Sequence, residues 1–112
     1  MEPQSTISRQ GEHVKWDNSL TSEEFVREIF YALSNDDSFR IFRLASDGID
    51  AGSEVLDQHG FSKKRYYLRL RQLIHLGLVR KDSGRYVHTN LGRLVHESTK
   101  QLEFQLSGQS HA

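Results

Sequence analysis

One stretch of this sequence changes from a helical to a strand-like hydrophobic period within a few residues, and this change constrains the fold most. Over residues 63–76 the large apolar side chains recur at helical spacing, and Ser62 stands where a helix cap is expected. Gly77 then suits the left-handed conformation in which many helices end. Residues 78–81 and 85–88 follow as two short strands around a tight turn. The sequence therefore predicts a helix that leads directly into a β-hairpin.

Capping residues followed by apolar residues at helical spacing occur four more times in the chain. They predict a helix at about 22–34 after Thr21 or Ser22, and a second one from a cap within 35–38 to before Gly48. A short helix is predicted to start at Asp50 or Ser53 and to end at His59-Gly60. A last helix is predicted to start at Thr89 or Asn90. Ile49 fits a very short strand. We expect a mostly α fold with a small β-hairpin (α+β), in which the short helix, the turn at Gly60 and the longer helix form a helix-turn-helix.

The length of 112 residues fits one domain with a core of its own. We expect a flexible N-terminal arm at 1–20, whose Val14-Lys15-Trp16 segment docks on the domain, and a folded domain at 21–98. An extension of the last helix is expected at 99–107 and a disordered tail at 108–112. The chain has no Cys, which excludes disulfides and thiolate metal sites.

No apolar run approaches the ~18 residues that span a bilayer. The N-terminal sequence MEPQSTISRQGEH also lacks the apolar centre of a signal peptide. We therefore expect a cytoplasmic protein without a membrane partner.

The charges of the chain cancel in total but are unevenly distributed. Residues 62–96 carry nine Lys or Arg side chains and one acid, Asp82, which gives this segment a net charge of +8. Residues 1–61 carry −7 and residues 97–112 carry −1. A concentrated basic segment is the electrostatic signature of a polyanionic partner, because Lys and Arg that neutralise phosphates release condensed counterions.

Three stretches of sequence resemble one family of regulators in the same order. Residues 32–48 read ALSNDDSFRIFRLASDG, residues 61–79 run from Phe-Ser through the basic helix to Gly-Leu-Val, and residues 89–93 read TNLGR. Together they resemble the ArsR-type winged helix-turn-helix regulators of bacteria and archaea across about residues 25–97, and the SKKRYY run at 62–67 is similar to archaeal members especially. The wing turn is shorter than in that family, and the cysteines of its thiol-type metal sensors are absent.

The resemblance implies a winged helix-turn-helix transcriptional regulator that binds double-stranded DNA as a homodimer. The alternative hypothesis is a winged-helix protein-interaction module of a transcription or chromatin assembly. Salt-dependent affinity for duplex DNA distinguishes the two.

The basic helix is the segment expected to enter the major groove, with its first residues near base edges. At about 100° per residue, with Leu70 facing inward, most of its polar side chains face away from the core. Arg65 is the residue that we expect to contact a base. Leu68 suits either a thymine methyl or a protein contact, and Arg69 suits a phosphate or an acid of the same domain. The predicted DNA-binding residues of this helix are Ser62, Lys63, Lys64, Arg65, Tyr67, Leu68, Arg69, Arg71 and Gln72.

The hairpin adds three basic residues around its turn: Arg80, Lys81 and Arg85. A basic wing tip can reach the minor groove or the phosphates beside it. Because the turn is short, we favour phosphate contacts.

The last helix carries an apolar stripe that is longer than the core of this domain requires. We expect Leu102, Phe104 and Leu106 of its distal half to pack against a second copy of the chain, next to apolar residues of the first helix. A helix end folded back on the chain's own first helix is the alternative. The predicted dimer interface contains Phe25, Ile29, Phe30, Leu91, Leu94, Val95, Leu102 and Leu106.

Other chemistry is weakly represented in the sequence. His75, His88 and His96 fall near one another, but without Cys or a His-x3-His spacing they predict no metal site. We interpret His88 and His96 as half-buried polar residues and His75 as a residue at or near the DNA-binding face. No nucleophile motif and no Gly-rich phosphate loop is present, so we expect neither an enzyme nor a cofactor, and the sequence indicates no particular small-molecule effector.

Overall fold

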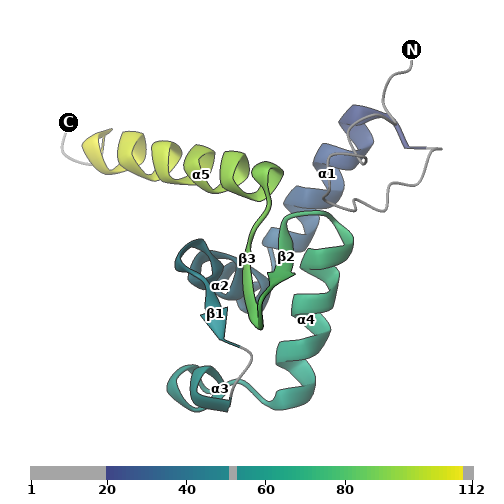
Figure 1. Cartoon of the computed structure of the whole chain (residues 1–112). Helices are drawn as coiled ribbons and strands as arrows, with labels where there is room; N and C mark the ends of the chain where they lie inside the picture. The colour runs from purple at the N-terminus through teal and green to yellow at the C-terminus, as the bar shows by residue number, and fades with distance from the viewer. Residues whose placement is uncertain (1–19, 51–52, 110–112) are drawn as a thin grey trace.

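The computed structural model describes residues 20–50 and 53–109. The arm expected at 1–20 lies outside this description except for Leu20, and so do residues 110–112. The chain is mostly helical, with one small antiparallel sheet, which confirms the predicted α+β class (Figure 1). The elements in chain order are α1 (Ser22–Leu33), α2 (Asp36–Leu44), the 3-10 turn η2 (Ala45–Asp47), β1 (Ile49–Asp50), α3 (Ser53–His59), α4 (Lys63–His75), β2 (Val79–Asp82), β3 (Arg85–His88) and α5 (Asn90–Gln109).

Side-chain caps fix where three of the helices begin. Thr21 and Glu24 form a capping box at α1, in which the Thr21 hydroxyl accepts from the Glu24 amide and the Glu24 carboxylate accepts from the Thr21 amide. Asn35 caps α2, and Ser62 caps α4 through its hydroxyl at 3.1 Å from the amide of Arg65. The predicted cap regions are therefore confirmed, with Thr21 rather than Ser22 as the cap of α1.

The sheet has the strand order β1-β3-β2, and both pairings are antiparallel. The strands β2 and β3 meet in a two-residue turn, because Asp82 pairs with Arg85 and Ser83 and Gly84 both have positive φ angles of 53° and 82°. Such a turn matches the twist of the flanking strands. The first strand of the hairpin is thus shifted by one residue, from the predicted 78–81 to 79–82, and the turn is one residue shorter. Ile49 of β1 pairs with Tyr86, which confirms the short strand predicted there.

The core lies where α1, α2 and α4 meet the sheet. The inward side chains of α4 are the three that helical spacing predicted, Tyr66, Leu70 and Leu73, and all three are buried. They pack with Ile41 and Phe42 of α2, which are also fully buried. Figure 1 shows α2 behind the sheet and α4 alongside it, so the outer face of α4 is left on the surface.

The start of α5 is fixed to the end of α4 by close backbone contacts. The Thr89 hydroxyl donates to the carbonyl of Gly77 and accepts from the amide of Gly92 at 2.9 Å, and the Thr89 amide donates to the carbonyl of Leu78. A Cβ atom at Gly92 would overlap the Leu78 carbonyl oxygen. Gly92 is therefore required for the close approach of α5 to the segment before β2. At its other end α5 continues to Gln109, two residues beyond the end expected at 107.

Replacement of Gly92 by Ala is expected to destabilise the protein, because backbone must move to make room for the methyl group. Overpacking of this kind typically costs about 1–3 kcal/mol of unfolding free energy. Gly108→Ala is the matched control, since Gly108 lies on the same helix with open space around its Cβ position. Urea unfolding of the two variants measures the difference, and equal midpoints would contradict the close contact at Gly92.

Two histidines are buried together between α2, β3 and α5. His88 and His96 are 8% and 7% exposed, their ring centroids lie 5.0 Å apart, and the His88 ring stacks on Phe42. His88 Nε2 lies 2.8 Å from the Phe42 carbonyl oxygen, and because a carbonyl only accepts, the neutral ring donates through Nε2. The Nδ1 atoms of both rings are buried without a hydrogen-bond partner among the described residues. The expectation that these residues are half-buried is therefore wrong, since burial is nearly complete.

Burial lowers the pKa of both His88 and His96, although the Phe42 carbonyl partly opposes this for His88. For His96 the charge of nearby Lys100 lowers the pKa further, and Glu97 opposes it. The unfolded chain then binds protons more readily than the folded one, so stability rises with pH through the window around the ordinary His pKa of about 6.5.

We therefore expect the melting temperature to fall as the pH is lowered from about 7.5 to about 5.5, since the full contribution of the neutral pair is present only above the unfolded-state pKa. The double variant His88→Gln, His96→Gln removes both titrating rings and should show a flatter dependence. His75→Gln, at an exposed position of α4, should keep the slope of the unsubstituted protein. Calorimetry across this pH range measures all three, and an unchanged slope in the double variant would exclude the pair as its source.

Candidate nucleic-acid interface

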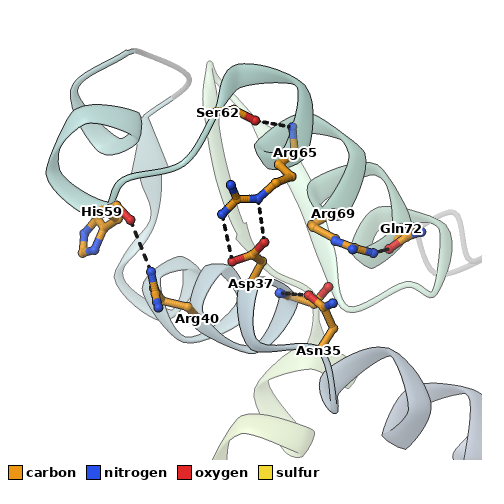
Figure 2. Close-up of polar contacts among 9 residues, drawn as sticks. Asn35, Asp37, Arg40, His59, Ser62, Arg65, Arg69 and Gln72 are labelled. Atoms are coloured by element: carbon orange, nitrogen blue, oxygen red, sulfur yellow. Dashed lines mark hydrogen bonds and ion pairs between the residues drawn. The ribbon is translucent and has the colours of Figure 1, made fainter.

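The short helix α3 and the basic helix α4 are joined by a tight turn. Gly60 has a φ of 70° in this turn, a conformation that favours glycine, and the Phe61 amide donates to the Leu56 carbonyl. Arg40 of α2 donates to the His59 carbonyl at 3.2 Å, which ties the end of α3 to α2 (Figure 2). The turn sets the direction in which the first residues of α4 leave the domain.

Most of the side chains predicted to face DNA are on the surface of α4. Tyr67 and Arg69 are the two that are only partly exposed. Tyr67 packs edge-on against Tyr66, with ring centroids 5.1 Å apart. The exposed members of the predicted set on this helix and at its cap are Ser62, Lys63, Lys64, Arg65, Leu68, Arg71 and Gln72.

Arg65 forms an ion pair with Asp37 of α2. Its Nε lies 2.9 Å from Asp37 Oδ2 and its Nη2 lies 3.4 Å from Asp37 Oδ1 (Figure 2). The hydrogen bond from Arg65 holds the pKa of Asp37 below its usual range, against a smaller opposing effect of burial. The residue expected to contact a base is thus held in one orientation by an acid of a neighbouring helix.

Arg69 contacts its own helix rather than an acid. Its Nη1 donates to Gln72 Oε1 at 3.3 Å, and its Nε is buried without a hydrogen-bond partner among the described residues. Among residues 20–50 and 53–109 no acid forms an ion pair with Arg69, although its charge contributes to the lowered pKa of Asp37. The guanidinium end remains near the surface beside Gln72 (Figure 2).

The three basic residues of the hairpin differ in their surroundings. Arg85 donates to the Asp47 carbonyl at 2.8 Å and lies 3.4 Å from the Asp50 carboxylate, so it links β3 to the η2–β1 segment. A Cβ at Gly48 would clash with the same guanidinium, so this glycine makes room for it. Arg85 is therefore partly occupied within the chain, whereas Arg80 and Lys81 are exposed beside the turn.

Lys81 lies over the ring of Tyr86 at 5.8 Å from its centroid, and Arg80 lies 3.8 Å from Asp82. Both contacts are at the surface, where such interactions are weak. These two side chains are consequently available to a ligand.

Sequence reasoning missed the acids Asp37 and Asp50 as partners of these cations. The helix dipole accounts for an acid in the first turn of a helix, such as Asp37, and turn chemistry accounts for an acid at the end of a strand, such as Asp50. Neither position therefore indicates that the acid pairs with a distant cation. Arg65 and Asp37 lie 28 positions apart in the chain.

A groove of about 790 Å³ runs between the corner of α1 and α2 and the outer face of α4. Its α4 wall includes Leu68, Arg71 and His75, and Tyr31 lies on the α1 side. Leu68 and Tyr31 are among the exposed large apolar residues of the chain. The predicted DNA-facing surface is therefore concave and partly apolar along the second half of α4.

The residues predicted for a dimer interface fall into two groups. Phe25 and Ile29 are buried in the core of the single chain, so the prediction that they lie at its surface is wrong; the hydrophobic face of α1 packs inward against α2. Phe30 is exposed. Leu91 and Val95 pack partly against the core, while the other predicted residues of α5 are exposed: Leu94, Leu102 and Leu106.

An ion pair joins the distal half of α5 to α2. Arg43 Nη1 lies 2.5 Å from Glu103 Oε2, and this hydrogen bond lowers the pKa of Glu103. Beyond this contact α5 extends away from the rest of the domain (Figure 1). Phe104, which is expected to pack against a second copy together with Leu102 and Leu106, is 71% exposed there.

The geometry thus defines a small α+β protein with an exposed basic helix beside a short hairpin. No protein-family model, no curated protein and no solved structure matches the chain. Over residues 20–50 and 53–109, no three His, Asp or Glu side chains gather into a candidate metal site. No helix in this part of the chain is long and apolar enough to cross a membrane.

Proposed function

We propose that this chain is a winged helix-turn-helix transcriptional regulator that binds double-stranded DNA as a homodimer. In this proposal α3 and α4 are the helix-turn-helix, α4 enters the major groove, and the hairpin β2–β3 is a short wing on the phosphates. The proposal assigns no catalytic step and no cofactor to the chain. It extends the resemblance to ArsR-type regulators seen in the sequence.

The observation that carries the proposal is the charge at the start of α4. The first turns of α1 and α2 contain acids, as the helix dipole favours, whereas the first turn of α4 contains none. Lys63, Lys64 and Arg65 stand there instead, all exposed, at the end of the helix where cations are least favourable for its stability. A polyanion at this end would reverse the penalty, because it attracts both the cations and the free backbone N–H groups.

The direction of the hairpin supports the same binding face. The strand β2 leaves from the C-terminal end of α4 and runs back along it, and β3 returns to α5. The turn at Ser83-Gly84 therefore points toward the N-terminal end of α4 and away from α5 (Figure 1). Arg80 and Lys81 beside this turn can then contact the same nucleic acid as Lys64.

Selection of bound duplexes from a random pool tests sequence-specific binding, and titration at several salt concentrations tests the phosphate contacts. The logarithm of the affinity should fall linearly with that of the salt concentration. Lys81→Ala should weaken binding to all sequences about equally and reduce the magnitude of this slope by about 1. Lys100→Ala is the matched control, because Lys100 is an exposed cation on α5. This variant loses the same charge and should leave the salt slope unchanged.

If no duplex bound detectably even at ~50 mM salt, where phosphate neutralisation contributes most, the DNA-binding proposal would be refuted. A protein-interaction module is the second candidate, and the exposed Leu68 and Tyr31 in the groove beside α4 are what favour it. Under that candidate, substitutions at Leu68 would matter and the salt slope would be absent.

The exposed apolar residues of α5 support the homodimer. Leu102 and Leu106 share one face of α5, well beyond its contact with the core, and are 60% and 57% exposed. A two-fold dimer through this face would place two α4 helices about one DNA turn, ~34 Å, apart on a palindromic site.

We expect sedimentation at tens of micromolar to give a dimer mass for the unsubstituted chain and a monomer mass for Leu102→Glu, because the buried charge would have no partner. Gln101→Glu adds the same charge at the neighbouring exposed position and should leave the dimer intact. A monomer mass for the unsubstituted chain would contradict the proposed assembly.

A further inference from the structure

The ion pair between Arg65 and Asp37 uses one particular edge of the guanidinium. Asp37 accepts from Nε and from Nη2, which lie on the same side of the group. The outer edge, formed by Nη1 and the second hydrogen of Nη2, points away from the carboxylate. Figure 2 shows the Arg65 side chain reaching from the first turn of α4 to the first turn of α2.

The outer edge of an arginine, like the edge formed by Nε and Nη2, presents two parallel N–H groups in a fork. That fork matches the O6 and N7 acceptors of guanine in the major groove. The Arg65 side chain is 49% exposed, and its hydrogen bonds to Asp37 use Nε and Nη2 rather than Nη1. The side chain of Asp37 is only 19% exposed and is therefore the better-fixed partner of the two.

Stability alone gives little reason for this pair. Because the Arg65 side chain is half exposed, water screens its charge and a long side chain must be ordered, so the pair contributes little to folding. An acid next to a DNA-facing surface also repels phosphates. The helix dipole accounts for an acid in the first turn of α2, but not for its two hydrogen bonds to Arg65. These bonds order a flexible side chain that would otherwise have to be ordered when a base is contacted.

We propose that Asp37 is a positioning residue that holds Arg65 in the orientation needed to recognise one guanine. This inference rests on the proposed DNA-binding function and names a specificity determinant within it. Asp37 itself contacts no base in this account; it acts through Arg65. The preference for guanine at one position of the site should therefore depend on both residues.

The test compares Asp37→Asn with Asp36→Asn by duplex selection and by titration of single-base variants of the selected site. Both changes remove one negative charge from the first turn of α2, but Asp36 is exposed and makes no contact with Arg65. Asp37→Asn should lower the preference for guanine at one position by about 2- to 12-fold, which is the cost of ordering one long side chain on binding. Its affinity for unrelated duplexes should stay the same or rise.

The Asp36→Asn variant should keep the guanine preference of the unsubstituted protein. In an Arg65→Lys background, Asp37→Asn should change base preference no further, because lysine has no fork to orient. Circular dichroism and melting temperature check that each variant is folded. A change confined to melting temperature would mean that the pair only joins α2 to α4.

The outcomes separate this inference from the function on which it rests. Failure of the unsubstituted protein to bind any duplex would overturn the proposed function, and the inference with it. Sequence-specific binding with a guanine preference that survives Asp37→Asn would overturn the inference alone. So would an equal loss in Asp36→Asn, or a loss that persists when Arg65 is lysine.

Discussion

Burial of Phe42 on α2 is the interaction on which the rest of the structure depends. Its ring is fully enclosed and contacts both buried histidines, His88 from β3 and His96 from α5, while its carbonyl accepts the hydrogen bond of His88. Loss of such an aromatic ring typically costs about 3–5 kcal/mol, a large share of the roughly 5–15 kcal/mol that stabilises an ordinary domain. Polar side chains of the same helix contact three other elements. Asp37 bonds to α4, Arg40 to the end of α3, and Arg43 to the distal half of α5. One nine-residue helix therefore orients each of the parts that the proposed function uses.

Local sequence signals account for much of this fold. Helix starts could be predicted because a cap such as Ser62 bonds to an amide only three residues away, and the inward face of α4 follows from the spacing of Tyr66 and Leu70. The short hairpin could also be placed, although its turn is two residues long because Ser83 and Gly84 both adopt positive φ.

What sequence reasoning did not find are the contacts between distant segments. Arg85 donates to a backbone carbonyl 38 positions away, and Arg65 donates to an acid of another helix. Because these partners are distant in the chain, the sequence alone gives no sign that either cation is paired. The face of α1 that carries Phe25 was equally ambiguous, because an apolar stripe does not say whether it covers the chain's own core or another molecule. The candidate site was thus predictable as a set of exposed basic residues, but not the pairing that gives two of them fixed directions.

The attachment of α5 has a mechanical consequence. Thr89 and Gly92 hold the first turn of this helix against the segment between α4 and β2, and about 30 Å of helix extends from that point. The surface ion pair between Arg43 and Glu103 is a further attachment. The helix then acts as a lever: a tilt of about 10° at its first turn would displace its far end by about 5 Å, one helical turn. In a dimer joined through the far ends, the tilt would be passed back to both basic helices as a change in their separation. In such a dimer, the packing of Thr89 and Gly92 would therefore affect the separation of the two basic helices.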